Sequence, residues 1–210
     1  MGATDAFSWH MERDPVLRPS IVVVVWLDRT PDWDTLVARV DRMSRLMPSL
    51  RQRVVDSPVP LVAPRWTFDP HFDLSWHLRR IGAPEPRTRE AVLQFARGPA
   101  MDTFDRGRPL WEVTLVDGVE NGQAALIAKI HHSLSDGVGG MQMLAAIADL
   151  ERRPRALGEM PPEPAGGPPR RGRDHLPGDL VHQDLAEQLP ARHLLAVADE
   201  RGTRCVLTSL

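Results

Sequence analysis

A continuous apolar run near the N-terminus is the feature that most constrains the fold. Residues 21–27 have the sequence Ile-Val-Val-Val-Val-Trp-Leu, with neither a charge nor a turn-forming residue. The run is far shorter than the ~20 residues of a membrane-spanning helix. Continuous rather than alternating apolar character is typical of a strand that is buried on both faces. We therefore predict such a strand here, with a helix to follow it.

Helical periodicity appears directly after this strand. Apolar residues recur at helical spacing over residues 36–47, which predicts an amphipathic helix. We expect Thr30 to cap this helix, Pro31 to occupy its first turn and Pro48 to end it. Three shorter elements are predicted next, namely strands at 51–55 and 65–68 and an amphipathic helix at 88–96.

The middle of the chain has the pattern of a β-hairpin. Residues 110–117 alternate between two faces, and residues 123–130 form a second apolar run. Between them, residues 118–122 contain the turn-forming pair Asn121-Gly122. A further helix is predicted at 137–150, so the hairpin's second strand leads through a short connection into a helix.

Composition excludes several classes of protein. The chain has 210 residues, 42% of them hydrophobic, which is enough to build a core. Its net charge of −2 provides no general field for nucleic acid, so we expect no nucleic-acid partner. Cys205 is the single cysteine, which rules out an internal disulfide and a cysteine-based zinc site, and fits a cytoplasmic protein. Residues 1–9 lack the pattern of a signal peptide.

A change of composition divides the chain. Residues 154–178 are rich in proline and glycine, as in a linker. We therefore predict a domain over residues 1–153 and a short C-terminal tail over residues 179–210. Within the tail, residues 179–189 and 191–199 have helical character, and residues 204–207 could form a short strand.

The segment between the hairpin and the predicted helix carries the chemistry. His131 and His132 stand where the strand ends, and Asp136 and Gly137 follow within the same stretch, His-His-Ser-Leu-Ser-Asp-Gly. Strand alternation directs the two histidines to opposite sides, so one can face a channel while the other packs inward. An accessible histidine with a fixed tautomer is suited to general-base catalysis. A packed histidine without a catalytic role is the main alternative, whereas diverging neighbours make metal binding a weak one.

This stretch resembles the HHxxxDG motif of the CoA-dependent acyltransferase superfamily. Residues 108–112, which include Pro109, Leu110 and Trp111, resemble the RPLWE box of the bacterial wax ester synthase/diacylglycerol acyltransferases. Residues 125–132 and 72–78 resemble two further segments of that family, and Asp5, Ala6 and Trp9 resemble its opening. The likeness extends over residues 3–153.

The resemblance implies a fold and a mechanism. The fold would be α/β, a chloramphenicol acetyltransferase-like N-terminal domain with a mixed sheet flanked by helices. His132 would be the general base that transfers an acyl group from acyl-CoA to diacylglycerol or a long-chain alcohol. His131, Asp136 and Gly137 would shape the site, without a metal or a cofactor other than acyl-CoA as substrate. A peripheral position on the inner face of a membrane, or on a lipid droplet, is compatible with such substrates.

Family members of this lipid type are considerably longer, and their active site lies between two similar domains. The resemblance therefore implies that this chain holds the N-terminal half. Two alternatives follow. The chain could be an inactive half-domain that binds acyl-CoA, lipid or a partner, or a condensation-type acyltransferase with a carrier-protein donor. The RPLWE-like box argues against the latter.

Overall fold

A computed structural model describes residues 3–12, 14, 19–58, 62–134, 143, 158–164 and 205–206. Within these residues a five-stranded mixed sheet has the strand order β4-β5-β6-β1-β7, and β2 and β3 form a separate two-stranded sheet. The large sheet comprises β1 (Ser20–Leu27), β4 (Leu78–Gly82), β5 (Trp111–Val119), β6 (Gln123–His131) and β7 (Cys205–Val206). The remaining elements are α1 (Ala3–Met11), α2 (Trp33–Leu46), η1 (Pro48–Arg51), β2 (Gln52–Val55), β3 (Arg65–Phe68), η2 (Leu74–Trp76), α3 (Arg89–Met101) and η3 (Glu120–Gly122).

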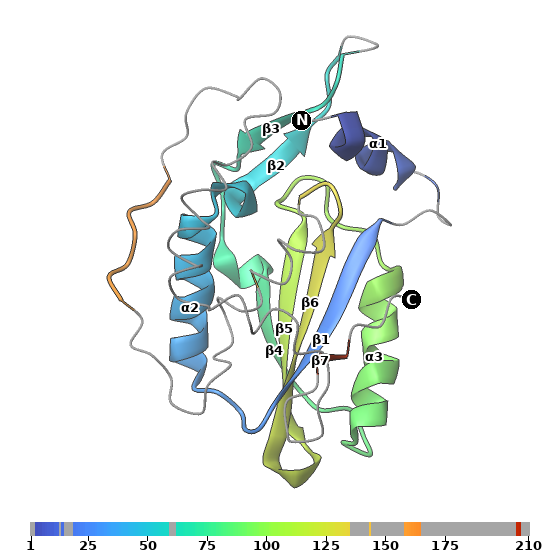
Figure 1. The fold of residues 1–210 in the computed structure, drawn as a ribbon, viewed down its shortest axis with the longest axis vertical. Helices are drawn as coiled ribbons and strands as arrows, with labels where there is room; N and C mark the ends of the chain where they lie inside the picture. The colour runs from blue at the N-terminus through green and yellow to red at the C-terminus, as the bar shows by residue number, and fades with distance from the viewer. Residues whose placement is uncertain are drawn as a thin grey trace, which may run out of the picture.

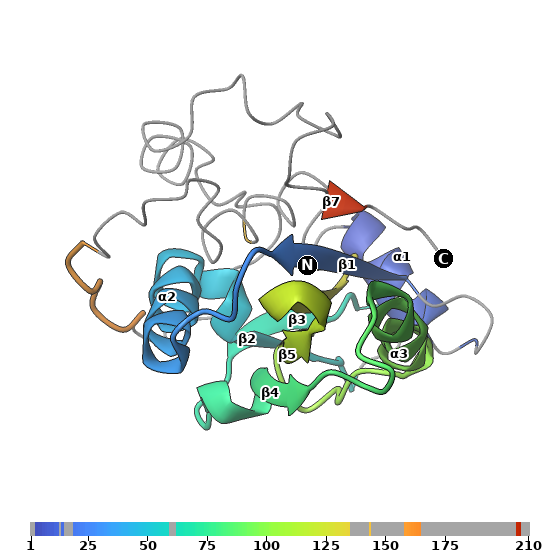
Figure 2. The same ribbon diagram turned by 90° about the horizontal axis from the view of Figure 1, so that it is seen from below.

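Helices α2 and α3 cover opposite faces of the sheet (Figures 1 and 2). Strand β1 lies between β6 and β7 and is antiparallel to both. Val23 and Val25 pack in the core on the α2 face, whereas Val24 and Trp26 pack on the α3 face. The prediction of a strand buried on both faces is therefore confirmed.

The helix after β1 starts later than predicted. Its N-terminal cap is Asp32, whose carboxylate accepts hydrogen bonds from the backbone N–H of Thr35 at 2.9 Å and from its hydroxyl at 2.8 Å. The prediction of Thr30 as the cap is wrong, because Asp32 is the residue placed to bond the first free N–H groups of this helix. The buried face of α2 includes Leu36, Val40 and Met43, as the periodicity predicted.

The predicted hairpin is confirmed. Strands β5 and β6 pair antiparallel and are joined through η3, with a register irregularity between Val116 and Val119. Gly118, Asn121 and Gly122 all have positive φ, at 71°, 59° and 71°. Glycine and asparagine adopt this conformation most readily, which explains why the sequence pattern identified the turn.

Helix α3 is longer than predicted. Thr88 caps it by accepting the N–H of Ala91 at 3.3 Å, and the helix continues past Gly98 and Pro99 to Met101. The N–H of Asp102 closes the last turn by bonding to the carbonyl oxygens of Gly98 and Pro99. The sequence suggested an end at residue 96 because glycine and proline usually interrupt helices.

A third cluster of apolar side chains lies at one end of the large sheet. Trp9 of α1, Val54 of β2, Phe104 and Leu110 are buried together, with Trp66 of β3 packed against them. In Figure 1, α1 and the two-stranded sheet lie beyond the end of β6. This end of the molecule is where His131 terminates β6.

Several predicted segments lie wholly or partly outside the described residues. Of the helix predicted at 137–150, Met143 alone is described, and it is helical and buried in the core on the α2 face. Within the predicted linker, residues 158–164 contact α2, where the guanidinium of Arg45 donates to the carbonyl of Pro161. The helices predicted at 179–189 and 191–199 are outside the described residues. Strand β7 falls within the strand expected at 204–207. The proposed domain boundaries stay a prediction.

Candidate active site

Sheet register brings the two sequence motifs together. Trp111 of β5 lies opposite Ile130 of β6, and the N–H of His131 donates to the carbonyl of Leu110 at 3.1 Å. On the other side of β6, Ser20 of β1 pairs with His131. The RPLWE-like box and the histidine pair thus meet at one end of the sheet.

His132 follows the last residue of β6 and is exposed to solvent. Its backbone is nevertheless held, because its N–H donates to the carbonyl of Pro19 at 2.8 Å. Asp136 and Gly137, which were expected to support the site, are outside the described residues. An accessible imidazole on a fixed backbone has the access that a general base requires, and the role of His132 stays a prediction.

The side chain of His131, unlike that of His132, is enclosed by the protein. It is fully buried, and its ring lies edge-on to Trp9 and Phe104, with ring centres 6.3 and 6.0 Å away. Its Nδ1 accepts the backbone N–H of Ser133 at 3.0 Å and lies 2.7 Å from the Ser133 hydroxyl. An Nδ1 that accepts a backbone N–H is unprotonated, so this geometry assigns the proton of the neutral ring to Nε2. That Nε2 is buried without a hydrogen-bond partner among the described residues.

The surroundings of His131 disfavour a charged ring. Burial lowers the pKa of His131 to about 4, and electrostatic interactions with His132, Arg106 and Lys129 act in the same direction. His131 is therefore neutral at physiological pH. The expected divergence of the two histidines is confirmed, with His131 inside and His132 outside.

Trp111 of the RPLWE-like box is a core residue. Its side chain is fully buried, and its indole N–H donates to the carbonyl of Leu50 at 2.7 Å. The Trp111 ring stacks on His77 at 4.6 Å between ring centres, and His77 stacks in turn on Phe72 at 5.2 Å. His77 is bonded through Nδ1 to the carbonyl of Trp111 at 2.8 Å, and burial lowers the pKa of this histidine. The sequence did not predict this stack, because its three rings come from separate segments and share no periodic spacing.

Helix α1 closes the histidine end of the sheet through Trp9. The indole N–H of Trp9 donates to the carboxylate of Asp56 at 2.8 Å. The guanidinium carbon of Arg106 lies 3.5 Å from the centre of the Trp9 ring, and Arg106 also donates to the Trp9 carbonyl at 3.1 Å. Trp9, identified from the sequence by resemblance alone, is thus one wall of the His131 site.

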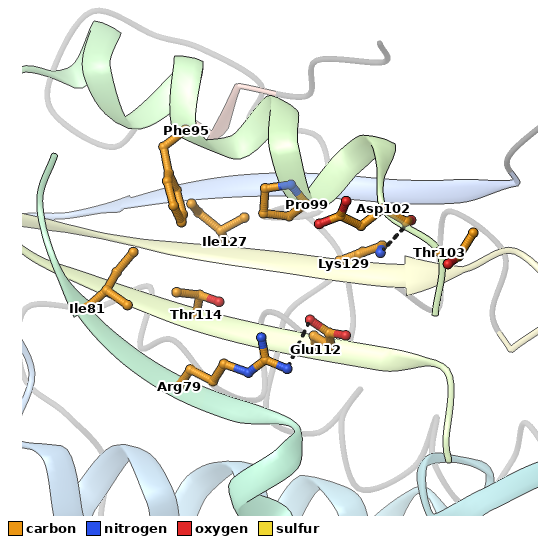
Figure 3. Close-up of a pocket in the computed structure, with 10 residues that line it drawn as sticks. All are labelled: Arg79, Ile81, Phe95, Pro99, Asp102, Thr103, Glu112, Thr114, Ile127 and Lys129. Atoms are coloured by element: carbon orange, nitrogen blue, oxygen red, sulfur yellow. Dashed lines mark hydrogen bonds and ion pairs between the residues drawn. The ribbon is translucent and has the colours of Figure 1, made fainter. Parts of the chain in front are cut away.

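A pocket of about 210 Å³ opens on the α3 face of the sheet (Figure 3). Polar residues gather at its histidine end, where the ammonium of Lys129 donates to the carbonyl of Asp102 at 2.8 Å and Arg79 lies 3.8 Å from Glu112. Apolar residues line the other end. The lining consists of Arg79, Ile81, Phe95, Pro99, Asp102, Thr103, Glu112, Thr114, Ile127 and Lys129.

Two searches of the described residues gave negative results. They contain no group of three or more histidine, cysteine or acidic side chains that could hold a metal ion. None of the helices in this described part is long and apolar enough to cross a membrane.

Solved structures identify the class of fold. The wax ester synthase/diacylglycerol acyltransferase of Marinobacter aquaeolei VT8 superposes with a TM-score of 0.63 and 29% identity, over 77% of this chain and 40% of that one. The starter condensation domain of rhizomide synthetase RzmA superposes with a TM-score of 0.59 and 16% identity, over 70% of this chain. At that identity the second match shows the fold alone. The chain therefore has the α/β fold that condensation domains share with these acyltransferases, as predicted.

Sequence comparison identifies the family. The sequence profile of the wax ester synthase/diacylglycerol acyltransferase catalytic domain matches residues 1–201. A Mycobacterium tuberculosis protein provisionally named a diacylglycerol O-acyltransferase is 41% identical over 186 residues, which are 86% of this chain and 38% of the relative. A second protein of that organism, tgs3, named a probable diacylglycerol O-acyltransferase, is 32% identical over 76% of this chain and 59% of its own length. The chain belongs to the wax ester synthase/diacylglycerol acyltransferase catalytic-domain family, and it spans less than two thirds of each of these relatives.

Proposed function

We propose that this chain takes part in transfer of a fatty acyl group from acyl-CoA to the hydroxyl of diacylglycerol or a long-chain alcohol, with His132 as the general base. The observation that carries the proposal is the contrast within the histidine pair. His131 is buried and neutral, whereas His132 is exposed on a backbone held by the Pro19 carbonyl. Family membership supports the reaction class.

The proposed chemistry requires only one proton carrier. The imidazole of His132 takes the proton of the acceptor hydroxyl while that oxygen attacks the thioester carbonyl. The tetrahedral intermediate then collapses, the C–S bond breaks, and the imidazolium returns the proton to the leaving thiolate, which gives an ester and free CoA. Base catalysis of this type contributes ~10²–10⁴-fold. No cofactor besides the acyl-CoA substrate is needed.

The substrates suggest where the reaction takes place. Acyl-CoA is a soluble cytoplasmic thioester, whereas diacylglycerol and long-chain alcohols reside in membranes. We therefore place the reaction at the cytoplasmic face of a membrane or at a lipid-droplet surface. Flotation of the full chain with diolein-containing vesicles, compared with vesicles lacking diolein, tests this placement.

The decisive experiment uses labelled palmitoyl-CoA with diolein or hexadecanol as acceptor. His132→Ala should lower ester formation by ~10²–10⁴-fold, in line with the loss of a general base. His71→Ala is the matched control, since His71 is also an exposed histidine in an irregular segment. Equal ester formation by the native chain and His132→Ala would contradict the assignment of the base. Binding of palmitoyl-CoA without any ester would favour an inactive acyl-CoA-binding domain instead.

A further inference from the structure

Three consecutive backbone N–H groups are held in the turn that carries His132. The N–H of His132 donates to the Pro19 carbonyl at 2.8 Å, and that of Leu134 donates to the His131 carbonyl at 2.9 Å. The N–H of Ser133, between them, donates to Nδ1 of the His131 ring at 3.0 Å. Residue 131 therefore accepts two of the three bonds, one through its main chain and one through its side chain.

The side chain of Ser133 makes a second contact with the ring nitrogen that accepts the middle bond. Its hydroxyl lies 2.7 Å from the same Nδ1, and Ser133 itself is only 5% exposed. Since Nδ1 already accepts a backbone N–H, it cannot carry a proton, so the hydroxyl must donate to it as well. A single ring nitrogen thus accepts both donors of Ser133. This geometry fits one tautomer and one ring orientation of His131.

We propose that Ser133 is a positioning residue for His132. By donating its N–H and its hydroxyl to Nδ1 of His131, it holds the neutral Nε2–H tautomer of that ring and, through it, the turn from which His132 projects. This inference rests on the proposed role of His132 as the base. Ser133 itself touches no substrate in this scheme.

The surroundings of His131 explain why the hydroxyl matters. The ring packs at a steep angle to Trp9 and Phe104, and its Nε2 finds no acceptor among the described residues. A reversed ring would therefore lose both contacts at Nδ1 without gaining another, and the Nδ1–H tautomer would lose the bond from the Ser133 backbone N–H. Arg106 and Lys129 disfavour a protonated ring, in agreement with the lowered pKa of His131. The Ser133 contacts are what remains to select the state of this ring.

Ser133→Ala tests the inference, because it removes the hydroxyl and keeps the backbone N–H. Imidazole ¹⁵N shifts in the ¹⁵N-histidine-labelled full chain should keep the Nε2–H tautomer of His131, because the backbone N–H of residue 133 still donates to Nδ1, while the Nδ1 resonance moves towards that of a less strongly hydrogen-bonded nitrogen. Amide exchange at positions 132–134 should accelerate on the order of tenfold, because local opening becomes easier. Where ester formation is measurable, kcat should fall on the order of tenfold with an unchanged KM for palmitoyl-CoA, as expected for a misplaced base.

Two further variants separate positioning from general destabilisation. Ser133→Thr retains the hydroxyl and should restore the native Nδ1 shift and the slow exchange. Ser44→Ala removes another buried hydroxyl, one that bonds to Asp41 and Arg51, and should alter neither His131 property. The inference is overturned if Ser133→Ala leaves the Nδ1 shift or the exchange rates at native values, or if an active chain keeps its native kcat. Failure of the proposed function is a separate outcome, in which His132→Ala leaves ester formation unaffected. In that case the imidazole ¹⁵N shifts and the amide exchange rates still test the role of Ser133.

Discussion

The two faces of the sheet are built from the same strands but differ in chemistry. On the α2 face, Leu115 of β5 and Leu126 of β6 are buried against Leu36, Val40 and Met43 of the helix. On the α3 face, the neighbouring positions on the same strands include Glu112, Thr114 and Lys129, which line a pocket (Figure 3). Helix α3 packs over β1 and β6. The part of this face formed by β4 and β5 contributes polar side chains to the pocket.

The unequal histidines are explained by how the two faces end, not by how open they are. Strand alternation places His131 in the same row as Lys129 and Ile127, and places His132 in the row of Ile130 and Ala128. The row on the α3 face ends under Trp9 and Phe104, so its histidine is buried. The row on the α2 face ends in the turn, and its histidine is exposed. One alternating pattern thus yields two environments.

The largest expected effect comes from breaking the apolar face. Leu126→Ala should lower the free energy of unfolding by about 2–5 kcal/mol, because Leu126 is only 1% exposed and its truncation leaves a cavity. Thr114→Ala, on the α3 face, should cost less than about 1 kcal/mol. Urea denaturation of the two variants measures both values. Equal losses would show that the two faces are packed alike.

A smaller effect follows from the buried histidine. The pKa of His131 is about 4 in the folded chain against an ordinary value of 6.5. Between these two pH values the unfolded chain binds a proton that the folded chain does not, so stability should fall as pH drops from 6.5 to 4. The full difference is roughly 3.5 kcal/mol at most, since the pKa differs by about 2.5 units and one unit corresponds to about 1.4 kcal/mol. Denaturation at pH 7 and pH 5 should show a loss that His131→Gln reduces, and an identical loss in that variant would contradict the assignment.

The smallest effect is expected at the open edge of the pocket. Arg79 has a half-exposed side chain, and its nitrogen lies 3.8 Å from the Glu112 carboxylate. Exposed pairs of this kind contribute about 0–1 kcal/mol, so Arg79→Ala should change the free energy of unfolding by less than that. Thermal unfolding at low and high salt provides the measurement. A loss above about 2 kcal/mol would mean that the α3 face is more tightly closed than the geometry indicates.

Local patterns predicted most of the described elements. The continuous run of β1, the alternation of β5 and the Asn121-Gly122 turn all act within a few residues, and all three were confirmed. Helix α1 and strand β4 were not predicted, and the other errors occurred at helix ends. Asp32 rather than Thr30 caps α2, and α3 continues through Pro99, because competing caps and tolerated breakers are decided by packing.

The sequence by itself determined where the strands other than β4 lie, that the two histidines diverge, and the family to which the chain belongs. Only the tertiary structure decided which histidine is buried and what surrounds it. The walls of the His131 site come from α1 and from Phe104, and the His132 backbone is held by Pro19. These contacts join segments far apart in the chain. Strand register and side-chain packing bring such segments together, and neither can be predicted from local periodicity in the sequence.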